Sequence, residues 1–124
     1  MAPHDPQMLK GVLRLLVLTL LEAEEDYGYA LVVRLRELGF DDLAEGTVYP
    51  ALARMESAGL LEGRLVRSSS GPARKYYRVT DAGHAERERA ETDWRSLAST
   101  VDRALDDREP TTTAPPEPTE VAQR

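Results

Sequence analysis

Apolar residues recur at helical spacing in the first third of the chain. From Leu9 to Leu21 they cover most of the surface that a helix would have, which predicts a helix buried on most sides. The acidic turn at residues 24–26 precedes a second helical pattern, with Asp26 as the expected N-cap and Gly39 as the expected C-cap. The apolar side of this second helix is expected to comprise Ala30, Val33, Leu35 and Leu38.

A third helix is predicted to begin near Gly46 or Thr47 and to end at Gly59. Pro50 would then fall in its first turn, where the missing N–H costs little. The buried stripe of this helix is expected to comprise Val48, Leu52 and Met55, at i, i+4 and i+7. The opposite face is expected to comprise Thr47, Ala51 and Arg54, with Pro50 beside them.

Two short strands are predicted next. Residues 61–67 alternate loosely, with Leu61 and Leu65 on one face, and residues 75–79 are rich in β-forming Tyr and Val. The cluster of serines, glycine and proline at residues 68–72 marks a turn between them. The two strands therefore form a hairpin, whose loop is expected to be longer than the tightest turns.

The last predicted element is a long helix that Thr80 can cap. Apolar residues along it step by 4, 3, 4 and 3 positions, and this heptad seam comprises Ala90, Trp94, Leu97, Val101 and Ala104. In one interpretation this helix folds back on its own core. We favour the interpretation that the seam packs on a second copy of the chain, because the first three helices already have apolar faces to satisfy one another.

These elements predict a fold that is mainly α with a small β-hairpin. Three short helices followed by a hairpin is the order of a winged helix-turn-helix, here with a long C-terminal dimerisation helix added. We expect a flexible N-terminus at residues 1–7, a winged helix-turn-helix DNA-binding domain at 8–80 and the dimerisation helix at 81–106. Residues 107–124, rich in Pro and Thr, are expected to form a disordered tail.

Composition excludes several kinds of site. The 124 residues include no Cys and only His4 and His84, which excludes disulfides, thiol catalysis, Cys-ligated zinc and a His-rich metal site. The longest apolar run contains Lys10 and Arg14 and falls far short of the roughly 20 apolar residues of a membrane span. The first residues lack the basic start of a signal peptide. We therefore expect a cytoplasmic protein with no membrane partner and no cofactor.

The residues also show no catalytic arrangement. The paired acidic residues lie in predicted turns or at a helix end, where solvated charge is the usual role. There is no Gly-rich phosphate loop either. The chain is therefore expected not to be an enzyme.

The net charge of −6 is unevenly distributed along the chain. Residues 1–45 carry 4 basic and 9 acidic side chains, residues 46–80 carry 6 and 2, and residues 81–124 carry 6 and 11, so the three blocks are −5, +4 and −5. Salt screens the acidic blocks beyond about 8 Å, so the central block can meet a polyanion locally. An ordinary solvated surface is the alternative interpretation.

The basic block coincides with the segment that would contact DNA. The second helix of a helix-turn-helix motif enters the major groove, and here that helix is predicted at residues 47–58. Its candidate contacts are Thr47, Tyr49, Pro50 and Arg54. The hairpin would be the wing, with candidate phosphate contacts at Arg64 and Arg67 on the first strand and Arg74 and Lys75 in the loop. The alternatives are that Tyr49 packs against the wing or the second helix, and that Arg74 and Lys75 are solvated loop charges.

Four segments, in order and at compatible spacing, resemble the PadR family of bacterial transcriptional regulators. Residues 46–52 (GTVYPAL), with the Met-Glu and Gly-Leu pairs that follow, are very similar to the recognition-helix signature of the family. Residues 8–11 (MLKG) resemble its opening, and residues 27–29 (YGY) resemble the entry to its second helix. Residues 74–80 (RKYYRVT), followed by Gly83, resemble its wing strand and the start of its last helix. The resemblance covers about residues 8–100.

The resemblance implies a homodimer that binds pseudo-palindromic operators, mostly as a repressor. It also implies release of DNA, in many members, when a small aromatic or amphipathic molecule binds. The interface would join the first and last helices, with Leu9, Leu13, Leu16, Ala90, Trp94, Leu97 and Val101 as candidate residues. Trp94 resembles a position that stacks on planar ligands in some members, and Leu15 and Thr19 would line the same space. The alternative is a packed interface Trp without a ligand.

Two rival functions stay open at this stage. One is a winged-helix protein–protein interaction module, which the overall acidity favours slightly and the basic central block disfavours. The other is a small-molecule receptor without specific DNA binding, centred on Trp94.

Overall fold

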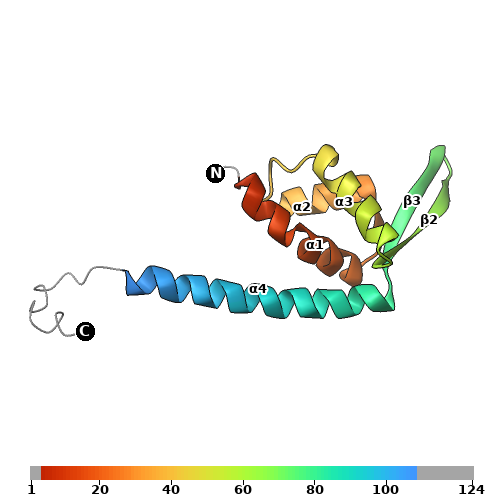
Figure 1. The fold of residues 1–124 in the computed structure, drawn as a ribbon. Helices are drawn as coiled ribbons and strands as arrows, with labels where there is room; N and C mark the ends of the chain where they lie inside the picture. Colours follow the sequence, from red (N-terminus) through yellow and green to blue (C-terminus); the bar gives the residue numbers. More distant parts are fainter. Residues whose placement is uncertain (1–3, 109–124) are drawn as a thin grey trace, which may run out of the picture. The chain divides into compact units, whose positions relative to one another are not determined.

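The computed structural model describes residues 4–108, which fall into two compact units. The first unit ends at Thr92 and the second begins at Asp93. The elements are α1 (Pro6–Ala23), β1 (Asp26–Tyr27), α2 (Gly28–Leu38), α3 (Glu45–Ser57), β2 (Leu61–Ser68), β3 (Gly71–Val79) and α4 (Asp81–Asp107) (Figure 1). The predicted fold class, a winged helix-turn-helix with a long C-terminal helix, is confirmed. Residues 1–3 and 109–124, where a flexible N-terminus and a tail were expected, lie outside the described residues.

The core of the first unit lies between α1, α2 and α3, and the sheet adds Leu61 and Val79 to it. The most completely buried side chains are Leu18, Leu31, Leu35, Leu52, Met55, Val17, Val32 and Val48. The predicted stripe of α3 is thereby confirmed. The predicted face of α2 is confirmed at Leu35, which is buried, but it is wrong at Leu38, which is 59% exposed. The helix instead buries Leu31 and Val32, which were not predicted. Adjacent apolar residues on so short a helix do not define one face by spacing alone.

The first helix starts earlier than expected. Asp5 is its N-cap and accepts a hydrogen bond from the Gln7 amide at 2.9 Å. Pro6 follows as the first helical residue, where its missing N–H needs no partner. Part of the segment expected to be flexible therefore forms the first turn of α1. In the described part of the chain, no helix has both the length and the apolar character needed to cross a membrane.

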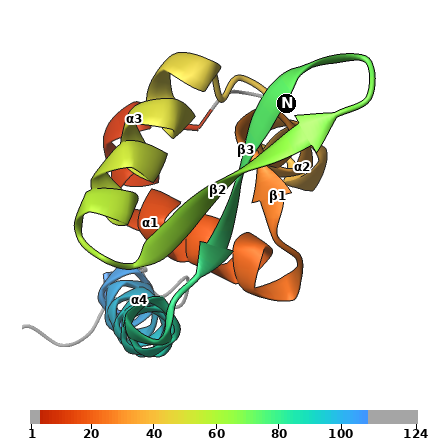
Figure 2. The ribbon, with the colours of Figure 1, turned by 90° about the vertical axis from the view of Figure 1, so that its right-hand side faces the viewer.

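A third strand, β1, was not predicted. Asp26 and Tyr27 pair antiparallel with β3, and the sheet has the order β1-β3-β2 (Figure 2). Asp26 is therefore not the N-cap of α2, which begins at Gly28. Its carboxylate instead accepts bonds from the Tyr27 amide at 3.0 Å and from Arg34 at 3.3 Å. The predicted C-cap is confirmed, since Gly39 has a φ of 124°, which favours glycine.

The third helix begins at Glu45, so Pro50 is its sixth residue and lies beyond the first turn, contrary to the prediction. Proline cannot donate to the carbonyl oxygen of Gly46 four residues earlier. Both residues are exposed, so water can satisfy that oxygen. Ala51 was expected on the exposed face, but it is 5% exposed and belongs to the core.

The hairpin is tighter and longer than predicted. Ser68 pairs with Gly71, so only two residues join β2 to β3. The strand β3 therefore includes Arg74, which the sequence had indicated in the loop, and has Lys75, expected at the boundary of loop and strand, in its interior. The outer part of the hairpin extends beyond the helices (Figure 2). Leu65 is accordingly 73% exposed, although the base of the same strand face is buried.

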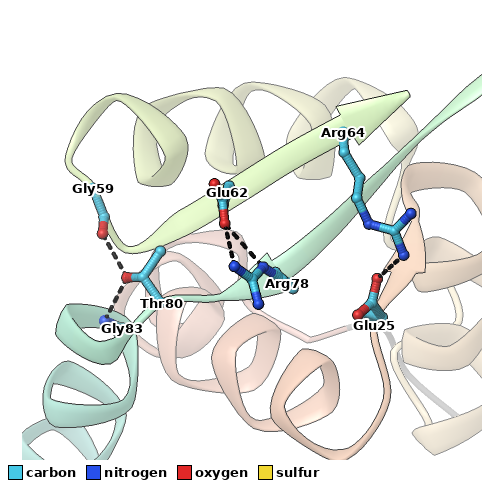
Figure 3. Close-up of polar contacts among 7 residues, drawn as sticks. All are labelled: Glu25, Gly59, Glu62, Arg64, Arg78, Thr80 and Gly83. Atoms are coloured by element: carbon cyan, nitrogen blue, oxygen red, sulfur yellow. Dashed lines mark hydrogen bonds and ion pairs between the residues drawn. The ribbon is translucent and has the colours of Figure 1, made fainter. Parts of the chain in front are cut away.

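The fourth helix starts where the hairpin ends, and Thr80 caps it as predicted. The Thr80 hydroxyl accepts a bond from the Gly83 amide at 3.0 Å and donates one to the Gly59 carbonyl at 2.6 Å (Figure 3). A Cβ at Gly83 would lie 2.1 Å from the carbonyl oxygen of Leu60, so this position requires glycine. The start of α4 is thus joined closely to the end of α3.

Candidate DNA-binding interface

Three predicted contacts on α3, Thr47, Pro50 and Arg54, lie together on its exposed side. They line one wall of a cleft of about 500 Å³, and α1 forms the other wall. Lys10 and Arg14 of α1 face them across this cleft. The apolar residues that complete the lining are Leu13, Ala51 and Met55. The fold therefore gathers three cationic side chains from two helices around one opening.

Tyr49 lies on a different side of α3, towards the wing. It lines a smaller hollow of about 260 Å³. The other residues of that hollow are Tyr27, Gly28, Tyr29, Arg74, Lys75 and Tyr77. A Cβ at Gly28 would lie 2.5 Å from the Tyr49 ring, so the glycine lets this ring rest against the start of α2. Desolvation and the nearby Glu45 carboxylate raise the pKa of Tyr49.

The basic residues of the wing do not lie on one face. Arg64 pairs in register with Tyr76, and Arg74, two residues before Tyr76, shares that face. Lys75 points to the opposite face of the hairpin. Arg67 is exposed and lies within the register irregularity of β2. The wing therefore presents cations on both faces.

Aromatic rings lie beneath three of these cations. The distances from cation to ring centroid are 4.5 Å for Arg74 over Tyr27, 5.5 Å for Lys75 over Tyr77 and 6.0 Å for Arg64 over Tyr76. A ring face attracts the charge of a cation without occupying its N–H donors in a salt bridge. The tyrosines of the sheet thus help to hold the wing cations in place.

Two of the predicted wing contacts are also paired with carboxylates of the chain itself. The Arg64 guanidinium lies 2.6 Å from Glu25, and the Lys75 ammonium lies 2.8 Å from Glu56. The hydrogen bond to Glu56 raises the pKa of Lys75, because the carboxylate favours the charged form of the ammonium group. Sequence reasoning treated these cations as unpaired, because both carboxylates come from other elements and no local pattern connects them.

The apolar seam predicted on α4 is exposed in the second unit. The exposed fractions are 46% for Trp94, 59% for Leu97 and 46% for Val101, and Leu105, which was not predicted, is 51% exposed. Ala90, in the first unit, is half-buried. A run of large apolar side chains in contact with water is the usual mark of an interaction surface.

The predicted interface residues on α1 need one correction. Leu13 is 4% exposed and belongs to the core of its own chain, so it has no surface to offer to a second copy. A helix that is apolar on most sides buries at least one of those sides in its own core, and the spacing of apolar residues did not show which side that is. Leu9 and Leu16 are half-buried at the edge of the core. Of the two α1 residues predicted to contact an effector, Leu15 is half-buried and Thr19 is exposed.

Comparison with known proteins identifies relatives over most of the chain. The sequence model of the PadR-like transcriptional regulator family matches residues 17–89, more than half of the chain. A PadR-like transcriptional regulator from Bacillus cereus is 44% identical, with 80% of this chain and 96% of that chain covered and a TM-score of 0.72. A PadR family regulator from Eggerthella lenta is 38% identical, with 80% and 86% covered and a TM-score of 0.74. An uncharacterised protein of Lysinibacillus sphaericus is 27% identical over 97 residues, which are 77% of this chain and 89% of that protein.

The structural neighbours share the fold of this chain, and the family match covers α2, α3, both strands of the hairpin and the start of α4. The chain belongs to the PadR-like family and is a DNA-binding transcriptional regulator.

Proposed function

We propose that the protein is a homodimeric, ligand-responsive repressor that binds a pseudo-palindromic operator. It acts in the cytoplasm by binding, without catalysis and without a cofactor. The observation that supports this most directly is the polar side of α3, exposed between the cations of α1 and the basic wing. Residues 8–80 form its DNA-binding domain and residues 81–106 its dimerisation helix.

The DNA contacts that we propose divide into base and backbone contacts. On α3, Arg54 is the candidate for a bidentate bond to guanine, while the Tyr49 hydroxyl donates to a phosphate. In the same arrangement, Thr47 and Pro50 contact the wall of the DNA major groove beside Arg54. The wing residues that would contact phosphates are Arg64, Arg67, Arg74 and Lys75.

The dimer that we propose buries the apolar seam of α4. Its residues are Ala90, Trp94, Leu97 and Val101 of α4, with Leu9 and Leu16 of α1. The exposure of Leu97 and its neighbours supports this assignment, because a second copy would remove that apolar surface from water. A two-fold symmetric dimer would present two copies of α3 to two half-sites.

An effector, a planar aromatic or amphipathic molecule, would bind beside Trp94, with Leu15 and Thr19 as further contacts. Such a molecule lowers DNA affinity only if it binds better to the conformation that does not fit the operator. Trp94 is the single tryptophan, so its fluorescence reports on this site alone. Saturable quenching of this fluorescence by a panel of planar aromatics would support the effector site, and no saturable quenching would argue against it.

Fluorescence anisotropy with DNA from the gene's own upstream region and with an unrelated duplex tests the DNA contacts. Arg54→Ala should weaken upstream binding by about 1–3 kcal/mol and reduce the preference over the unrelated duplex. Arg103→Ala, an equal change of charge on exposed α4, is the control. Equal loss on both duplexes would assign Arg54 to phosphate rather than base, and unchanged binding would remove it from the interface.

Light scattering of the full chain tests the dimer. The expected mass is twice the 13.8 kDa of one chain at micromolar concentration. Leu97→Glu places a charge in the seam and should yield a monomer, whereas Ser96→Glu on the exposed neighbouring position should leave the dimer intact. A monomeric wild-type protein would refute this part of the proposal.

A further inference from the structure

The wing carries its positive charge in a partly neutralised form. On one face, Arg64 of β2 reaches Glu25 in the turn before β1 (Figure 3). On the other face, Lys75 of β3 reaches Glu56 of α3. Two of the four cations that we propose as phosphate contacts therefore have a carboxylate partner before any DNA is present.

The first pair spans the sheet. Because β3 lies between β1 and β2, the Arg64 side chain must cross β3 to meet Glu25. It does so over Tyr76, its register partner, which is in turn the partner of Tyr27 in β1. The pair therefore connects the outer strand of the wing to the opposite edge of the sheet.

The second pair uses a space that a glycine leaves open. A Cβ at Gly63 would lie 2.4 Å from Cε of Lys75 and 3.1 Å from a carboxylate oxygen of Glu56. The Lys75 side chain thus passes directly over Gly63 to reach Glu56. A Cβ at this position would force the end of the Lys75 side chain to move from its place beside the Glu56 carboxylate.

We propose that Glu25 and Glu56 are specificity-determining residues that compete internally with DNA phosphates for Arg64 and Lys75. This inference rests on the proposed wing contacts. Carboxylates and phosphates both accept charge-assisted hydrogen bonds from these cations, so a phosphate must displace the carboxylate. Phosphate contacts supply most of the affinity for any DNA sequence. Weakening them leaves the base contacts of α3 a larger share of the total binding free energy.

Arg74 provides the contrast within the same wing. It lies over the Tyr27 ring and, among residues 4–108, is paired with no carboxylate. Its donors are therefore available to a phosphate without displacing an acidic side chain. Arg74 contributes to DNA binding directly, whereas Arg64 and Lys75 contribute only the surplus over their internal pairs.

Anisotropy titration of a labelled, unrelated duplex against the whole chain at several salt concentrations tests this competition. Glu25→Gln and Glu56→Gln should each raise the affinity about two- to fivefold, the range expected for a partly exposed ion pair. Each should also steepen the slope of log K against log salt, by at most about 0.9 per added phosphate contact. Glu62→Gln is the matched control, because Glu62 pairs with Arg78 at the base of the same hairpin (Figure 3). This substitution removes the same single negative charge.

A charge-neutral variant separates local release from overall charge. Gly63→Ala should displace Lys75 from Glu56 and raise the affinity in the direction of Glu56→Gln, with no change in net charge. In an Arg64→Gln background, Glu25→Gln should raise the affinity no more than Glu62→Gln does, because the cation that it would release is absent.

The outcomes distinguish this inference from the proposed function. An equal rise in Glu62→Gln, or no rise in Glu25→Gln and Glu56→Gln, would overturn the competition while leaving the wing contacts in place. If Arg64→Ala and Lys75→Ala do not weaken binding, the proposed wing contacts fail, and the inference fails with them.

Discussion

Replacing Thr80 with valine tests how the wing and the last helix are joined. The hydroxyl makes two bonds at this junction, accepting from the Gly83 amide at 3.0 Å and donating to the Gly59 carbonyl at 2.6 Å. Valine has nearly the same shape and keeps the branched Cβ, but it can make neither bond. The substitution therefore removes the two hydrogen bonds with little change in packing.

The expected loss follows from these two bonds. Loss of an N-cap hydroxyl typically costs about 1 kcal/mol. A further hydrogen bond between neutral groups contributes about 1 kcal/mol. Thr80→Val should therefore lower the free energy of unfolding by about 2 kcal/mol, which corresponds to a fall in Tm of about 8–16 °C for a domain of this size.

Urea unfolding followed by far-UV circular dichroism measures this loss. All variants must be compared at one protein concentration, because dimerisation would add to apparent stability. Thr80→Ser retains the hydroxyl and should lie within about 0.5 kcal/mol of wild type. The reasoning is refuted if Thr80→Val costs less than about 0.5 kcal/mol, or if the serine variant loses as much as the valine variant, since the lost group would then be the methyl.

Two further predictions concern the α4 junction and the recognition helix. Hydrogen bonds from Arg89, with a smaller contribution from Arg14, lower the pKa of Glu86 from 4.5 to about 2. The ionised carboxylate therefore stabilises the fold fully above about pH 4.5, and this stabilisation is lost as the pH falls towards about 2. The difference in urea midpoint between wild type and Glu86→Gln should shrink over that interval. A difference that does not depend on pH would contradict this prediction. Gly28→Ala should displace the Tyr49 ring, which a new Cβ would approach to 2.5 Å, and lower DNA affinity by about 1 kcal/mol, the size of one hydrogen bond, without destabilising α2. Unchanged affinity would mean that the Tyr49 hydroxyl does not contact DNA.

Local patterns predicted those features that depend on neighbours in the sequence. The stripe of Val48, Leu52 and Met55 is confirmed because burial on a helix follows its own period. The caps at Thr80 and Gly39 are confirmed because capping involves residues within one turn. Where two faces of a helix are almost equally apolar, as on α1 and α2, the spacing of apolar residues does not show which face is buried.

Other features depend on partners far along the chain. The strand β1 is two residues long and is defined only by its pairing with Tyr76 and Tyr77, about fifty positions later. The sequence offered an acidic turn at that place, and Asp26 was assigned to the wrong role for this reason. The length of β3 likewise depends on the register that Ser68 and Gly71 establish across a two-residue turn.

By itself, the sequence determined the class of this protein: the helical stripes, the hairpin, the heptad seam and the motifs of the PadR-like family are all local signals. Only the tertiary structure decided which charges of the basic block are paired. Arg64 and Glu25 are 39 positions apart, and Lys75 and Glu56 are 19 apart. Ion pairs form wherever folding brings opposite charges within a few ångströms, and no periodicity encodes that distance. The number of cations in the wing can be read from the sequence, but their availability to DNA depends on the fold.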